Sequence, residues 1–100
     1  MRETPTWTFL SNHAHVLRCV AADRDVRLRD VAAAVGLTER AAARLVGELE
    51  AYGYVTHERM GRRNRYEIDE TRPLDHPLES HLVVRDLVEL AATERRLVGG

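Results

Sequence analysis

Arginines are the residues whose spacing points most directly to chemistry in this sequence. All 15 basic residues are arginines, and the net charge is −1. Residues 59–65 hold four arginines and no acid, and Arg40 and Arg44 lie one helical turn apart. A planar guanidinium makes two-pronged contacts with phosphate and with the O6 and N7 atoms of guanine, so these clusters indicate a nucleic acid as partner. The alternative is an arginine-rich surface that only contacts water.

The five histidines and the lone cysteine do not fall at spacings that favour a metal site or catalysis. His13 and His15 are two residues apart in an expected helix, and His76 and His81 are five apart, so neither spacing suits chelation. Cys19 lies in an apolar helix and is interpreted as a small core residue. The sequence has no nucleophile elbow, phosphate-binding loop, dinucleotide fingerprint or zinc-protease motif. We therefore expect no enzyme, no metal and no cofactor, with a metal site assembled across a dimer as the alternative.

Length and composition fit one folded domain over residues 1–100. The chain has 100 residues, of which 44% are hydrophobic and 31% charged, as in globular rather than disordered proteins. It has no apolar run near the roughly 20 residues that span a bilayer, and no secretory leader pattern. The single cysteine excludes an internal disulfide and favours a reducing compartment. We expect a cytoplasmic protein that does not contact membranes.

Caps, turn residues and hydrophobic spacing predict the elements that would position the arginines. Ser11 and Thr38 can cap helices, Gly36 can end one, and Pro77 suits a first helical turn. The elements expected in chain order are a helix at 11–22, a short strand at 26–28, helices at 29–35 and 38–52, strands at 54–58 and 65–68 around a turn at 60–64, and a long helix at 76–97.

The third expected helix separates an apolar stripe from an arginine face. Placed at about 100° per residue, its apolar positions fall on one side and Arg40, Arg44 and Gly47 on the other. The second helix, the Gly36 turn and this helix form a helix-turn-helix, whose second helix enters the major groove. The residues expected to face base edges are Thr38, Glu39, Arg40, Ala43 and Arg44. Discrimination between DNA sequences would depend mainly on Arg40 and Arg44.

A strand, basic turn and strand directly after a helix-turn-helix predict a winged helix. The run from Leu28 to Thr38, the Gly53-Tyr54-Val55 segment and the 61–66 turn resemble the DNA-binding domains of MarR-like and ArsR-like bacterial transcription regulators. The resemblance covers about residues 11–70 and implies a mostly helical fold with a small antiparallel hairpin. It implies contacts with phosphate or the minor groove from the wing arginines Arg59, Arg62, Arg63 and Arg65. Two departures are a chain shorter than MarR-like proteins and the lack of the Cys-Val-Cys box of ArsR-like metal sensors.

The expected last helix, at 76–97, carries more apolar positions than one stripe can bury within a single small domain. We expect one side to pack on its own chain and the other to form a homodimer seam, and the residues assigned to the seam are Leu82, Val83, Leu87, Leu90 and Ala91. The alternative is a helix covered by Trp7, Phe9 and Leu10 of the same chain. Whether the segment around Trp7 and Phe9 joins the seam stays open.

These features together predict a dimeric transcription regulator that binds double-stranded DNA at specific sequences. One arginine–guanine contact discriminates by about 1–3 kcal/mol, which is too little for one subunit to select a genomic site. The alternative function is a winged-helix protein-interaction module whose wing docks on an acidic partner. The sequence leaves open whether an unidentified small-molecule effector acts on the protein.

Overall fold

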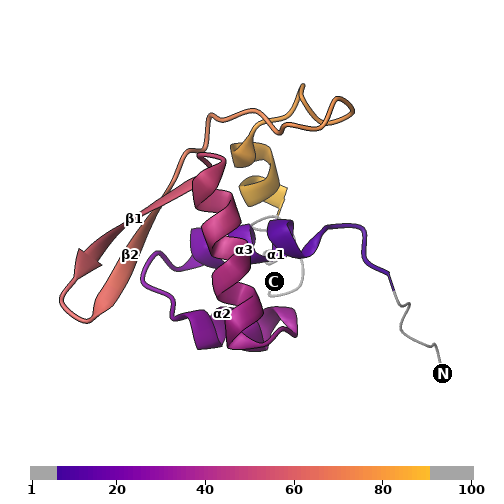
Figure 1. Cartoon of the computed structure of the whole chain (residues 1–100). Coiled ribbons are helices and arrows are strands. Elements are labelled where there is room, and N and C mark those ends of the chain that lie inside the picture. The colour runs from indigo at the N-terminus through magenta and orange to yellow at the C-terminus, as the bar shows by residue number, and fades with distance from the viewer. Residues whose placement is uncertain (1–6, 91–100) are drawn as a thin grey trace, which may run out of the picture.

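The computed structural model describes residues 7–90, in which a bundle of three helices carries an antiparallel hairpin (Figure 1). The elements in chain order are α1 (Asn12–Ala22), α2 (Leu28–Val35), α3 (Glu39–Ala51), β1 (Val55–Met60) and β2 (Arg63–Ile68). A further helical stretch covers residues 84–90. The predicted order of three helices followed by a hairpin is confirmed, and this is a winged helix-turn-helix.

The predicted caps and the glycine turn define how α2 leads into α3. The Ser11 hydroxyl accepts a hydrogen bond from the Ala14 N–H at the start of α1, and the Thr38 hydroxyl accepts one from the Ala41 N–H at the start of α3. Gly36 ends α2 with a φ of 88°, a left-handed conformation that strains residues with a side chain. The N–H groups of Gly36 and Leu37 both donate to the Ala32 carbonyl, so the chain reverses within one turn.

One apolar core holds the helices and the base of the hairpin together. Residues at helical spacing on α1, α2 and α3 meet there because each helix has one apolar face. β1 and β2 each add one buried side chain, Val55 and Tyr66, and Val84 joins from the helical stretch at 84–90. The buried core residues are Val16, Leu17, Val20, Val31, Ala32, Ala42, Leu45, Val46, Leu49, Val55, Tyr66 and Val84.

The hairpin extends away from this core (Figure 1). Its register pairs Val55 with Ile68 at the base and Met60 with Arg63 at the tip. Only residues 61 and 62 connect the strands, and Gly61 has a φ of 65°. Glycine at the first central position suits a two-residue type II′ turn. The predicted turn at 60–64 is therefore too long, because strand pairing continues to Met60 and Arg63.

The short strand predicted at 26–28 is wrong. Leu28 is the first residue of α2, and the Val26 N–H donates to the Asp23 carbonyl in a turn. The segment reaches the hairpin through one backbone bond, from the Tyr66 N–H to the Arg24 carbonyl at 2.8 Å. The apolar–polar alternation at 26–28 arises because Val26 and Leu28 pack against the core from a linker, and not from a third strand.

The long helix predicted from residue 76 is also wrong at its start, since helical structure begins at residue 84. Residues 74–83 form a closed loop instead, because the Leu74 N–H donates to the Leu82 carbonyl and the Val84 N–H donates to the Arg72 carbonyl. Successive turns from His76 to Leu82 satisfy the backbone inside this loop. The predicted part over 91–97 lies outside the described residues.

Candidate nucleic-acid interface

The outward face of α3 presents the residues that the sequence assigned to base reading. Ala42, Leu45, Val46 and Leu49 are buried against the core, which turns the opposite face of the helix to solvent. Ala43 and Gly47 on that face are small, so the helix backbone can approach another surface closely. The predicted reading residues are all exposed: Thr38, Glu39, Arg40, Ala43 and Arg44.

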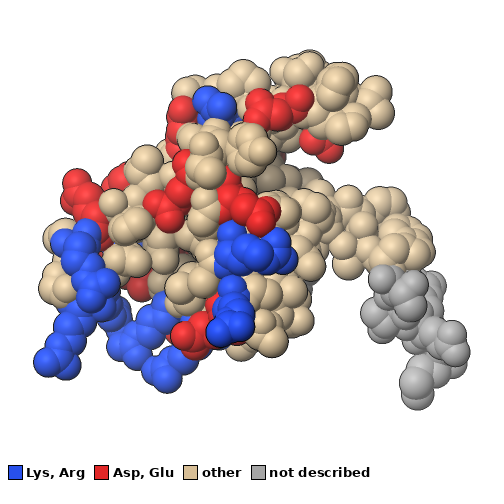
Figure 2. All heavy atoms as spheres, viewed as in Figure 1, with Lys and Arg blue, Asp and Glu red and all other residues tan. Residues whose placement is uncertain are grey.

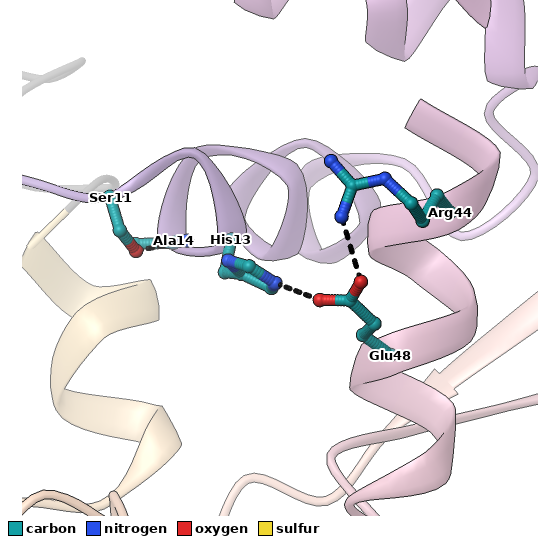
Figure 3. A network of polar contacts seen from close by, with 5 residues as sticks. All are labelled: Ser11, His13, Ala14, Arg44 and Glu48. Carbon is teal, nitrogen blue, oxygen red and sulfur yellow. Dashed lines mark hydrogen bonds and ion pairs between the residues drawn. The ribbon is translucent and has the colours of Figure 1, made fainter. Parts of the chain in front are cut away.

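The two arginines of α3 have different surroundings. Arg40 makes no hydrogen bond or ion pair with residues 7–90. The Arg44 guanidinium donates from Nη1 to Glu48 Oε2 over 2.8 Å, one turn further along α3. The other Glu48 oxygen, Oε1, lies 2.7 Å from His13 Nε2 on α1 (Figure 3). The hydrogen bond from His13 has the largest effect on the pKa of the Glu48 carboxyl, which it lowers; partial loss of solvent opposes this, and Arg44 lowers the pKa further.

The wing arginines are exposed but do not all share one face of the hairpin. Cross-strand pairing places Arg63 opposite Met60 and Arg65 opposite Glu58, on one face. Arg59 pairs with Asn64 on the other face, and its Nε donates to the Gly61 carbonyl over 3.0 Å. The alternation of side chains along each strand therefore divides the arginines of residues 59–65 between the two faces of the hairpin. Arg62 lies in the turn that joins the strands.

A hollow of about 390 Å³ lies between the hairpin and the start of α2. Arg62 and Arg63 line it from the hairpin, and Arg27 lines it from the residue just before α2. Asp25 also lines the hollow and lies 3.8 Å from the Arg65 guanidinium. Sequence reasoning missed Arg27, because only the fold brings residue 27 beside residues 62 and 63.

The basic side chains of α3 and of the hairpin occur on one face of the molecule. Figure 2 shows arginine side chains gathered over the end of the hairpin and over α3 in the same view. Most acidic side chains visible in this view lie above them. Arginine side chains of α3 and of the end of the hairpin are therefore visible from a common side of the molecule.

Some of the residues assigned to a dimer seam are exposed, and others pack against the protein's own core. Leu82 and Leu90 are exposed, at 37% and 52% of their surface. Val83 is half-buried, Leu87 packs against the core beside Val84, and Ala91 lies outside the described residues. Phe9 is 92% exposed and stacks edge-on against Trp7, so this segment does not cover the exposed leucines within one chain.

Histidines and Cys19 play local roles in the described structure. His57 Nδ1 lies 2.6 Å from a Glu50 carboxylate oxygen, and His76 Nδ1 accepts from the Leu78 N–H. Partial burial raises the pKa of the Cys19 thiol, which disfavours the reactive thiolate. Within residues 7–90, no three histidine, cysteine or acidic side chains are placed to hold a metal ion.

Residues 10–59 match the IclR helix-turn-helix domain, which covers α1, α2, α3 and most of β1. The chain belongs to the IclR helix-turn-helix family. Members of this family are DNA-binding transcription regulators and not enzymes. No curated protein matches the chain. No helix among the described residues of this IclR-type domain is long and apolar enough to cross a membrane.

Solved structures similar to this IclR-type domain are MarR-family regulators, as the sequence resemblance predicted. MepR, a transcription regulator of the Staphylococcus aureus multidrug efflux pump MepA, is 18% identical, with a TM-score of 0.56 over 89% of this chain. A mutant of Lactococcus lactis ZitR is 14% identical, with a TM-score of 0.60 over 99%. The Streptomyces coelicolor regulator PcaV, solved with its natural ligand, is 26% identical, with a TM-score of 0.53 over 90%. The chain spans 61–63% of the length of these three proteins.

Proposed function

We propose that this chain recognises specific sequences in double-stranded DNA as a homodimer. In this proposal α3 enters the major groove and the hairpin lies along the phosphate backbone or in the minor groove. The observation that carries the proposal is that α3 and the hairpin expose their arginines on the same face of the molecule (Figure 2). This role places the protein in the cytoplasm, where a bacterial chromosome lies.

Base reading is assigned to the first half of α3. Arg40 and Arg44 have the guanidinium fork that matches guanine, and Thr38 and Glu39 can reach nearer bases. Ala43 lies between the two arginines and is small enough to admit a thymine methyl group or a close groove wall. All five residues are exposed at the start of α3, which is the end that reaches base edges in this class of motif.

The wing is assigned to positioning rather than to base reading. Arg59, Arg62, Arg63 and Arg65 are exposed near the end of the hairpin, where long flexible cations can follow a phosphate backbone. Because strand alternation splits them between two faces, the hairpin can present guanidinium groups to both walls of a groove. Contacts of this kind fix the register of α3 and depend strongly on salt.

Dimerisation is assigned to the helical stretch at 84–90 and to the residues next to it in the sequence. Its assigned residues are Leu82, Val83, Leu87, Leu90 and Ala91, of which Leu82 and Leu90 are exposed and apolar. A twofold dimer would double the base contacts, and discrimination by one subunit is too small for a genomic site. Phe9 and Trp7 are exposed apolar side chains that a partner could also cover.

An unidentified small-molecule effector is assigned to a groove of about 350 Å³ beside α1. Leu10, Ala14 and Leu87 line it with apolar surface, and His13 and Tyr54 add polar groups. Pockets with this mixture bind small organic molecules. The structure of PcaV, to which this chain is similar, contains that protein's natural ligand.

DNA binding measured across a salt series tests the proposal. Fragments selected from random DNA supply the specific site, and a scrambled duplex supplies the control. We expect log K to fall with log salt by about 0.9 for each phosphate contacted. A flat response would instead support the protein-interaction module, whose acidic partner would replace DNA.

Two arginine substitutions separate base reading from positioning. Arg40→Ala removes a guanidinium from the reading face. It should reduce the binding free-energy preference for the specific duplex over the scrambled one by about 1–3 kcal/mol. Removing the guanidinium in Arg63→Ala should weaken binding to both duplexes equally and reduce the salt slope by about 1. An equal loss of preference in both variants would contradict the assigned roles.

A further inference from the structure

Glu48 is an acidic residue that belongs to neither of the arginine clusters identified in the sequence. Glu48 lies on α3 just beyond the reading residues, and each of its two carboxylate oxygens has a partner. One oxygen accepts from Arg44 of the reading face, and the other contacts His13 of α1 (Figure 3). The carboxylate therefore links the reading face of α3 to the helix packed behind it.

This link restricts a side chain that would otherwise be free. An exposed arginine samples many rotamers, and ordering it on a ligand costs free energy. Arg44 is already held at one end of its guanidinium by a 2.8 Å bond, which leaves its remaining N–H donors available. Arg40 on the same face has no partner among the described residues. The Arg44 side chain is therefore more restricted than the Arg40 side chain before DNA binds.

The carboxylate also limits attraction to DNA in general. A negative group 2.8 Å from Arg44 offsets its positive charge toward any phosphate, whatever the sequence. A guanine edge, in contrast, can satisfy donors of Arg44 that Glu48 leaves unused. Specificity is a difference between two affinities, so weakening the unspecific one increases it.

His13 anchors the arrangement on the body of the protein. It belongs to α1, which packs against α3 through the core, and its ring holds the Glu48 oxygen that Arg44 does not use. A glutamate tied at only one oxygen could follow the arginine out to a phosphate. With both oxygens engaged, Glu48 keeps its place on the surface of α3.

We propose that Glu48, anchored by His13, is a positioning residue that raises the sequence specificity of Arg44 in the DNA complex. The inference rests on the proposed function, in which Arg44 reads bases. It adds that a residue outside the interface sets the specificity of a residue inside it.

The matched control for this proposal lies two residues further along the same helix. Glu50 is also a carboxylate on α3 and also contacts a histidine, His57, over 2.6 Å. It has no arginine partner among the described residues. The variants Glu48→Gln and Glu50→Gln therefore make the same charge change and each weaken one contact with histidine, but only the first changes the contact with Arg44.

The experiment measures affinity for the selected site and for a scrambled duplex with the intact chain. We expect both variants to bind scrambled DNA more tightly, and only Glu48→Gln to lower the specific-to-scrambled ratio, by about two- to tenfold. In the Arg44→Ala background, Glu48→Gln should leave the ratio unchanged. His13→Gln should lower the ratio in the same direction as Glu48→Gln.

Two results would overturn the inference. One is an equal change of the ratio in Glu48→Gln and Glu50→Gln, and the other is a loss that persists without Arg44. Thermal unfolding of each variant separates these results from loss of the fold. If the parent chain has no sequence preference, the proposed function fails instead, so the two failures are distinguishable.

Discussion

Arg27 illustrates how much a single residue depends on its neighbours in space. It precedes α2, far in sequence from the hairpin, yet it lines the same hollow as Arg62 and Arg63. Three arginines and one acid, Asp25, line this hollow, so its charge is positive on balance and favours a phosphate. Local sequence contains no sign of this meeting, because contacts between distant parts of the chain determine how the hairpin lies against α2.

We predict that Arg27→Ala weakens binding to all duplexes equally and lowers the salt slope by about 1. The matched control is Arg29→Ala, which removes an equal charge from an exposed arginine that does not line the hollow. Fluorescence anisotropy with labelled DNA at several salt concentrations measures both variants. Equal effects would mean that net charge, and not the hollow, determines the contribution of Arg27.

A second residue-scale prediction concerns Glu48 and pH. The hydrogen bond from His13, reinforced by Arg44, makes the pKa of Glu48 lower in the folded chain than in the unfolded chain. A lowered folded pKa stabilises the fold at pH values above the unfolded pKa, and this contribution is lost as pH falls through the folded pKa. Urea unfolding should therefore show Glu48→Gln to be less stable than the parent at pH 7, and the difference should shrink in acid. A difference that is constant with pH would contradict the cause given for the shift.

At the scale of elements, signals confined to a few neighbouring residues predicted the structure well. The caps at Ser11 and Thr38 and the turn at Gly36 depend on bonds within one helical turn, and all three are present. The expected helix from residue 76 failed because distant backbone bonds, between residues 72–74 and 82–84, close that segment into a loop. Apolar content and Pro77 carry no information about such partners.

The glycine turn between α2 and α3 allows a prediction with an internal control. Gly36→Ala should lower the free energy of unfolding by about 1 kcal/mol, since a φ of 88° strains alanine although open space surrounds the position. Gly47→Ala introduces the same methyl group inside α3, also into open space, and should instead stabilise the chain by about 0.5–1 kcal/mol. Denaturant unfolding gives both values. Effects of the same sign would contradict the role of backbone conformation at Gly36.

On the scale of the whole molecule, the C-terminal helical stretch serves its own core as well as any partner. Val84 is fully buried, and Leu87 and Val88 pack against the same cluster. Removing the chain beyond residue 74 would therefore expose the core, and a truncated chain would report on folding rather than on dimerisation. The sequence places many apolar residues in this region, and the loop at 74–83 decides which of them reach the core.

A point substitution on the exposed side of this stretch tests the dimer without disturbing the core. Leu90 is 52% exposed and assigned to the seam, whereas Leu78 is 80% exposed in the loop and not assigned to it. Leu90→Glu should shift the chain from dimer to monomer, because a buried charge without a partner opposes association. Leu78→Glu adds the same charge and should leave the dimer intact.

Sedimentation or light scattering measures the mass of each variant, and circular dichroism checks that both remain folded. If Leu90→Glu stays dimeric while folded, the seam lies elsewhere, and the exposed Trp7 and Phe9 become the next residues to substitute.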